Sequence, residues 1–266
     1  MSGFRVNRAS VSCGRARSRD HILGRRPLQR RKRRIAGLER TFRGLIRGAV
    51  SRPGWRRDEV VVANKLWWEF WPDQSAAQEL DDSLGRMGFD YVDLAYSFTA
   101  PEGPPIETIV TSIGALIASG KLRAWGTANW PPEDHELAAI LAVQQGIPPP
   151  CAAQLPSNLV VREDVESSSA VRALDKSGAA IVASFVLCGG LLTGKYGNRL
   201  ASGRMAGELA NPEVSPLLRA ADDLRTLATK LDSTPAALAI AFALANDRVA
   251  TVLFGATRAS GVAENA

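Results

Sequence analysis

Two short segments combine glycines with hydroxyl and cationic side chains, a combination that suits a phosphorylated ligand. The first, 189–196, reads Gly-Gly-Leu-Leu-Thr-Gly-Lys-Tyr and closes an apolar run. The second, 255–258, reads Gly-Ala-Thr-Arg after another apolar run, with Glu264 and Asn265 close behind it. Glycines let a backbone approach a phosphate closely, and cations and hydroxyls donate hydrogen bonds to its oxygens. Together the segments predict a site for a nucleotide cofactor.

Further polar side chains stand where predicted strands end. Lys65 ends the first predicted strand, Asn129 follows the third, and Gln154 ends the fourth. Each has an ordinary alternative, because a lysine at a strand end is commonly solvated and a glutamine in a strand commonly satisfies a backbone group. Parallel strands of a barrel open on one face at their carboxyl ends, where active sites lie. Their shared position therefore favours a functional site.

The elements that must position these residues alternate along the chain from residue 36 onward. The apolar runs are continuous, which is typical of strands buried on both faces of a parallel sheet. The predicted strands are Glu59–Lys65, Tyr91–Phe98, Lys121–Thr127, Cys151–Leu155, Ala179–Leu187 and Val249–Gly255. The predicted helices are 36–50, 74–87, 105–119, 133–146, 162–177 and two between 213 and 246. This alternation favours an α/β fold, either a barrel or a doubly wound sheet.

Composition limits the class of protein. The chain has 266 residues, of which 45% are hydrophobic, enough for one barrel-sized domain. No apolar run approaches the ~20 residues that span a bilayer, so we expect no membrane insertion, and no secretory signal is recognised. Cys13, Cys151 and Cys188 are widely separated and suggest neither a disulfide framework nor a zinc site. We therefore expect a cytoplasmic protein.

Charge is distributed unevenly. Residues 1–57 hold 18 of the 33 Lys and Arg and 2 of the 27 acids, a net of +16, which leaves 15 − 25 = −10 for the rest. Residues 1–35 show no helical or strand period, and the Arg-rich run 30–34 repels itself, so we predict a disordered segment 1–35 followed by a domain over 36–266. Three interpretations stay open: an arm for nucleic acid or an anionic membrane, a transit peptide, or a solvated tail. We favour the tail and do not expect nucleic-acid contact.

Several kinds of chemistry have no support. The chain has two histidines, His21 in the Arg-rich segment and His135 in a polar helix. A Ser-His-Asp arrangement and a metal site are therefore not expected. Neither G-x-G-x-x-G after the first strand nor G-x-x-x-x-G-K-[ST] occurs, which argues against the dinucleotide fold and the P-loop.

From Asp58 to Asn265 the chain resembles the aldo-keto reductases, in particular the branch that includes the beta subunits of voltage-gated potassium channels. The matching segments are 57–65 (RDEVVVANK), 83–94 (SLGRMGFDYVDL), 119–130 (SGKLRAWGTANW), 189–196, and 255–258 with Glu264 and Asn265. The resemblance implies a (β/α)8 TIM barrel and NADP(H) as cofactor. It also implies a small carbonyl substrate and leaves a homo-oligomer open.

The resemblance assigns roles to individual residues. For the nicotinamide and the pyrophosphate, the implied contacts are Asn129 and Gln154 to the carboxamide, and Leu187, Gly189 and Lys195 along the phosphates. For the adenosine end, they are Arg204 as a clamp, Thr257 and Arg258 at the 2′-phosphate, and Glu264 and Asn265 at adenine. Gly255 is a further cofactor-binding position. Lys65 takes the position of the catalytic lysine.

The remaining catalytic positions depart from the family pattern. The substrate-orienting His corresponds to Phe98, and the aromatic residue that stacks on nicotinamide corresponds to Ser184. The family's proton-donor Tyr and its Asp precede the lysine, yet the tyrosines are Tyr91, Tyr96 and Tyr196, and residues 21–57 contain no Asp. The first two strands of the barrel are not recognisable in the sequence and its last helix is absent, so we expect an incomplete barrel.

These observations leave three functional hypotheses. The first is an NADP(H)-dependent oxidoreductase that reduces an aldehyde or a ketone, including sugar ketones, with much of its catalytic set missing. The second is a non-catalytic NADP(H)-binding regulatory subunit. The third is a truncated or frame-shifted product.

Overall fold

The computed structural model describes residues 56–98, 103–197, 203 and 205–255. Its centre is a six-stranded parallel sheet in the order β1-β2-β3-β4-β5-β6, so each strand pairs with the next one along the chain. The strands are β1 (Ala63–Leu66), β2 (Val92–Ser97), β3 (Leu122–Ala128), β4 (Ala152–Pro156), β5 (Ala180–Ser184) and β6 (Val249–Val252).

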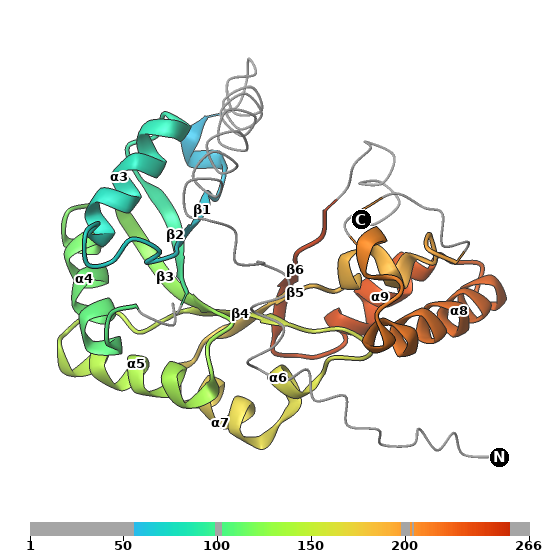
Figure 1. The fold of residues 1–266 in the computed structure, drawn as a ribbon. Coiled ribbons are helices and arrows are strands. Elements are labelled where there is room, and N and C mark those ends of the chain that lie inside the picture. Colours follow the sequence, from blue (N-terminus) through green and yellow to red (C-terminus); the bar gives the residue numbers. More distant parts are fainter. Residues whose placement is uncertain (1–55, 99–102, 198–202, 204, 256–266) are drawn as a thin grey trace. The chain divides into compact units, whose positions relative to one another are not determined.

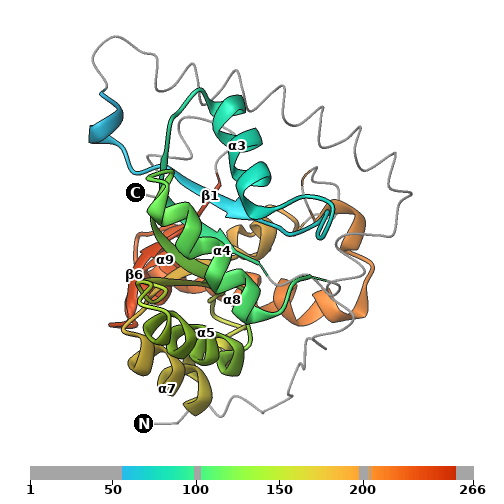
Figure 2. The same ribbon diagram turned by 90° about the vertical axis from the view of Figure 1, so that its left-hand side faces the viewer.

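Helices connect the strands, as a parallel sheet requires. The α-helices are α3 (Ala76–Met87), α4 (Ile106–Ala118), α5 (Pro132–Gln144), α6 (Glu163–Glu166), α7 (Ser168–Ser177), α8 (Ser215–Lys230) and α9 (Pro235–Leu244). Short 3-10 helices are η1 (Arg57–Glu59), η2 (Cys188–Thr193), η3 (Ala206–Glu208) and η4 (Pro212–Val214). Helices α3, α4, α5 and α7 follow one another along the outer side of the sheet (Figures 1 and 2).

All six predicted strands occur, but β1 begins at Ala63 and not at Glu59, which lies in η1, and β6 ends at Val252 and not at Gly255. Two further differences have a local cause. The fifth strand ends at Ser184 and not at Leu187, because Phe185 turns the backbone with a φ of 56°. The predicted helix over 162–177 is two helices that meet at Ser167, whose side chain caps α7 by accepting a hydrogen bond from the Ala170 N–H. The predicted helix 36–50 and the segment 1–35 lie outside the described residues.

Local signals in the sequence explain where helices begin and end. Ser75 and Gln78 form a capping box at the start of α3, and Gly88 ends that helix in the left-handed conformation. Thr234 accepts a hydrogen bond from the Ala237 N–H, and Pro235 occupies the first turn of α9. Thr234 and Pro235 therefore fix the start of α9.

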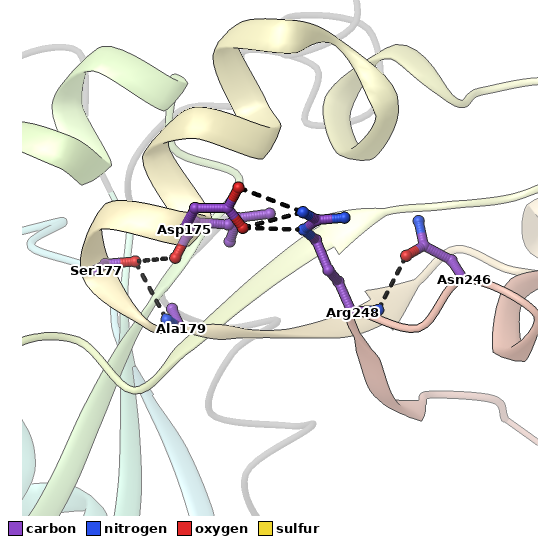
Figure 3. Close-up of polar contacts among 6 residues, drawn as sticks. Asp175, Ser177, Ala179, Asn246 and Arg248 are labelled. Atoms are coloured by element: carbon purple, nitrogen blue, oxygen red, sulfur yellow. Dashed lines mark hydrogen bonds and ion pairs between the residues drawn. The ribbon is translucent and has the colours of Figure 1, made fainter.

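The core lies between the sheet and its outer helices. Ile109 and Ile113 of α4 are buried against Trp125 of β3, and Leu80 of α3 belongs to the same cluster. Arg248, just before β6, pairs with Asp175 near the end of α7 at 3.0 Å from Nη2 to Oδ1, as Figure 3 shows. Both partners are largely exposed, so packing contributes far more than this ion pair to the stability of the fold.

The alternation of six parallel strands with helices is an α/β architecture of the kind found in TIM barrels. Within the described residues, β1 and β6 are the edge strands, and no strand connects them. The eight-stranded closed barrel therefore stays a prediction.

Among these same residues no single helix is long and apolar enough to cross a membrane. Helices α8 and α9, bent by 97°, satisfy that test only as a pair.

A charged cluster fixes the amino ends of β1, β2 and β3. Asp93 accepts a hydrogen bond from the Val62 N–H at 2.8 Å and forms ion pairs with Arg57 at 2.8 Å and Arg123 at 3.0 Å. The two guanidinium groups lie 4.0 and 4.1 Å from the ring centroid of Tyr91. Partial burial opposes ionisation of Asp93, but the Val62 hydrogen bond and the two cations outweigh it and lower its pKa.

Replacing Asp93 with asparagine should lower the free energy of unfolding by about 2 kcal/mol, because Arg57 would be left half-buried without its carboxylate. Urea unfolding followed by circular dichroism measures the change. Asp81→Asn, which removes the exposed partner of Lys121, is the matched control and should cost less than about 0.5 kcal/mol. Equal losses in the two variants would contradict a special role for Asp93.

Candidate functional site

The carboxyl ends of the strands bring the predicted residues to one edge of the sheet. Lys65 of β1 lies beside Tyr96 of β2, and Ala128 of β3 lies beside Gln154 of β4. Paired residues in a parallel sheet project to the same face. The buried cluster of Tyr96, Ala128, Ala152 and Val182 marks this face, which is opposite to the one covered by α4.

Lys65 is half-buried one residue before the end of β1. Burial lowers the pKa of its ammonium group. Its Nζ lies 6.0 Å from the centroid of the Phe98 ring, and Phe98 occupies the position where the family pattern places a histidine. An aromatic face thus stands beside the predicted catalytic lysine in place of an imidazole.

An aromatic platform adjoins Lys65, and sequence reasoning missed it. The ring of Trp67 stacks on that of Phe98 with centroids 4.4 Å apart and an interplanar angle of 8°. Glu79 of α3 accepts hydrogen bonds from the backbone N–H groups of Trp67 and Trp68, and the Trp68 indole donates to Ser97 Oγ at 2.9 Å. The cluster Trp67-Trp68-Glu69-Phe70-Trp71 is the sequence signal that could have indicated this platform.

Asn129 and Gln154 are adjacent, as the implied carboxamide contact requires. The Asn129 N–H donates to the Gln154 carbonyl at 2.9 Å, and Asn129 has a φ of 58° that places it in an exposed turn just past β3. Gln154 is buried, with 7% of the residue exposed. Two amide side chains at neighbouring strand ends can pair with both the donor and the acceptor of a carboxamide.

The glycine segment after β5 forms a tight loop. Gly189 and Gly190 have φ values of 66° and 94°, which glycine adopts at low cost. A Cβ on Gly190 would lie 2.8 Å from Lys195 Cε, and one on Gly203 would lie 2.9 Å from Lys195 Nζ. The exposed Lys195 ammonium therefore lies over backbone that has no side chains, a cradle that fits a phosphate group.

Two other residues brace this loop and were not foreseen. Asn158, fully buried, donates to the Phe185 carbonyl at 3.3 Å and accepts from the N–H groups of Val160 and Val161. The buried Tyr196 hydroxyl accepts from the Met205 N–H at 3.2 Å. Leu187 is half-buried at the start of the loop, next to Cys188.

Only part of the predicted binding region for the adenosine end of the cofactor lies within the described residues. Gly255 is exposed just past β6, with no heavy atom close to where its Cβ would be. Arg204, Thr257, Arg258, Glu264 and Asn265 lie outside the described residues, so their roles stay predictions. Within the described ranges, no group of three His, Cys, Asp or Glu side chains could hold a metal ion.

None of the three tyrosines stands at the sequence position where the family pattern places its proton-donor tyrosine. Tyr96 is buried beside Lys65 in the sheet register, and burial, with a contribution from Cys151, raises the pKa of its phenol to about 12. A phenol with that pKa holds its proton tightly and is a weak general acid near neutral pH.

The match to a family model decides the family. The model of the aldo/keto reductase family matches residues 43–266, which include all six strands. The chain belongs to this family. Among curated aldo/keto reductase relatives, a probable voltage-gated potassium channel subunit beta from rice is 33% identical over 226 residues, 80% of this chain and 69% of that protein. Its counterpart from Arabidopsis thaliana is 31% identical over 82% of this chain and 70% of its own length.

An enzyme stands among the relatives as well. The L-glyceraldehyde 3-phosphate reductase of Escherichia coli K12 is 29% identical over 225 residues, 79% of this chain and 64% of the enzyme. The aldo/keto reductase relatives thus include both a named reductase and proteins named as channel subunits, so the family alone does not decide between catalysis and regulation.

Proposed function

We propose that this aldo/keto reductase binds NADP(H) along the carboxyl edge of its sheet and reduces a small aldehyde or ketone there. The observation that carries the proposal is the pairing of Asn129 with Gln154 at the ends of β3 and β4, with Lys195 in the glycine loop after β5. NADP(H), when bound, supplies the hydride. Asn129 and Gln154 would orient its carboxamide, while Lys195 and the bare backbone of Gly190 would hold its phosphates.

The preference for NADP(H) over NAD(H) rests on Thr257 and Arg258, since an arginine at the ribose can bind a 2′-phosphate. The carbonyl substrate class rests on family membership and on the name of the Escherichia coli relative. A cytoplasmic location and a domain that begins near residue 36 belong to the same proposal.

Titration with NADPH should quench the tryptophan fluorescence of the protein, which has 6 Trp. Lys195→Met should weaken binding roughly tenfold to a hundredfold, because a charge-assisted contact to phosphate contributes about 1.5–3 kcal/mol. Lys230→Met, at the end of α8, is the matched control and should bind like the parent. The proposal fails if the parent shows no quenching up to millimolar NADPH.

A second candidate function is a regulatory subunit that binds NADP(H) without turnover. The observation that favours it is Phe98, whose ring is stacked on Trp67 where the family pattern places a histidine that orients substrate. Steady-state NADPH oxidation with a panel of aldehydes and ketones separates the two functions. Turnover that Lys65→Met abolishes supports the reductase, whereas tight NADPH binding without turnover supports the regulatory subunit.

A further inference from the structure

Lys65 is set apart from the other described lysines by its surroundings. It is half-buried and Lys176 is exposed, and Lys121 and Lys176 each pair with a carboxylate, that of Asp81 and that of Glu136. Among the described residues, no carboxylate lies within ion-pair distance of Lys65. Its Nζ faces the Phe98 ring, which contributes an apolar wall on that side.

These surroundings make the amine of Lys65 easier to deprotonate than that of an exposed lysine. A lysine ammonium without a counter-ion loses hydration on burial and gains little in return, so burial lowers the pKa of Lys65. A neutral lysine amine has a free lone pair and is a nucleophile toward carbonyl carbon. The tyrosine beside Lys65 in the sheet is Tyr96, whose pKa of about 12 keeps its phenol protonated.

We propose that the Lys65 amine forms a Schiff base with an aldehyde at the carboxyl edge of the sheet. The nitrogen lone pair attacks the carbonyl carbon and gives a carbinolamine. The carbon–oxygen bond then breaks, the oxygen leaves as water with the two amine hydrogens, and a carbon–nitrogen double bond remains. The step is a condensation, so no oxidant or reductant takes part, and it is reversible by the addition of water.

The aromatic platform indicates which aldehydes this amine would prefer. Trp67 is 48% exposed and its ring stacks on Phe98, and the Nζ of Lys65 lies 6.0 Å from the centroid of the same Phe98 ring. A flat aromatic group could lie against the exposed part of Trp67 while its aldehyde reaches Lys65. The inferred ligand is therefore an aromatic or conjugated aldehyde.

The experiment traps the Schiff base with sodium cyanoborohydride, using benzaldehyde as the probe and peptide mass spectrometry to find the modified lysine. The chain has six lysines, so each preparation contains its own controls. We expect Lys65 to be labelled roughly tenfold faster than Lys230 at neutral pH, as for a desolvated lysine. Equal labelling of the two lysines in the folded protein would overturn the proposal.

Variants separate reactivity from folding. Lys65→Arg keeps a cation but has no comparable nucleophile, so it should melt like the parent and lose the labelling at position 65. Trp67→Ala should slow labelling by benzaldehyde severalfold and leave labelling by acetaldehyde unchanged. An equal loss with both aldehydes would overturn the aromatic preference.

The chemistry of Lys65 is independent of the proposed cofactor site, since trapping needs no NADP(H). Lys195→Met should therefore retain labelling at Lys65 while it weakens NADPH binding. If NADPH does not quench the tryptophan fluorescence but Lys65 is labelled selectively, the proposed reductase function is rejected and the Schiff-base proposal stands. The reverse pattern would keep the cofactor site and reject the Schiff base.

Discussion

Replacing Gly126 with alanine is expected to lower the free energy of unfolding by about 3 kcal/mol, near the upper end for an overpacked core. Gly126 lies in β3 beside Ala152 of β4. A Cβ at this position would lie 2.4 Å from the Ala152 carbonyl oxygen and 3.1 Å from its carbonyl carbon. Both atoms belong to backbone, so the clash cannot be relieved by turning a side chain, and β3 and β4 must separate.

The measurement is thermal unfolding followed by circular dichroism, where a loss of this size lowers Tm by roughly 6–12 °C. Gly85→Ala is the control, since Gly85 lies inside α3 with no heavy atom within 4 Å of its would-be Cβ. That variant should be more stable than the parent by about 0.5–1 kcal/mol, because alanine favours the helix. A melting curve for Gly126→Ala that coincides with the parent's would show that the two strands are not packed this closely.

The separation of β3 and β4 also has a functional consequence. Asn129 and Gln154 stand at the ends of these two strands and are joined by a backbone hydrogen bond. The same alanine substitution should therefore weaken NADPH binding under conditions in which the variant is still folded. Gly85→Ala should leave NADPH binding unchanged.

The second large effect is a loss of stability in mild acid that depends on His135. The imidazole is 4% exposed, with Nδ1 2.8 Å from Thr127 Oγ1 of β3 and Nε2 2.8 Å from Ser177 Oγ of α7. Burial lowers the pKa of His135 from 6.5 to about 4. Asp164 lines the same small cavity as His135.

The direction of the pH effect follows from which state binds the proton. Between pH 6.5 and 4 the unfolded chain protonates this histidine and the folded chain does not, so stability is full above about pH 6.5 and falls toward pH 4. At 1.36 kcal/mol for each pKa unit, the loss from this group approaches about 3 kcal/mol. A protonated ring would also have to donate from both nitrogens while it stays buried.

Urea unfolding of the parent and of His135→Gln from pH 7 to pH 4 measures this loss. Glutamine does not titrate, so the variant should be less stable by about 1 kcal/mol at pH 7, where a hydrogen bond is lost, and the difference should shrink or change sign by pH 4. Carboxylates that titrate in this range contribute equally to both proteins and cancel in the difference. Two curves that stay parallel across this pH range would mean that His135 does not titrate with the depressed pKa.

The burial of His135 is the feature in which the structure differs most from what the sequence indicates. In the sequence His135 stands among Glu133, Asp134 and Glu136, which indicates a polar helix. In the structure the imidazole faces the core, because α5 packs against α7 and turns this position inward. The helical period of α5 is weak, since apolar residues occur on its exposed side too, as at Leu137 and Val143. The sequence therefore could not show which side of this helix is buried.

What the sequence by itself determined is local or follows from pattern. The alternation of strands and helices and the cap at Thr234 depend on residues near one another in the chain, and the match to the aldo/keto reductases depends on the order of segments along residues 43–266. Only the tertiary structure placed Phe98 beside Lys65 and against Trp67, buried His135 between Thr127 and Ser177, and ended β5 at Ser184. These contacts join residues of separate strands and helices, and they form only when strand pairing and helix packing bring those elements together.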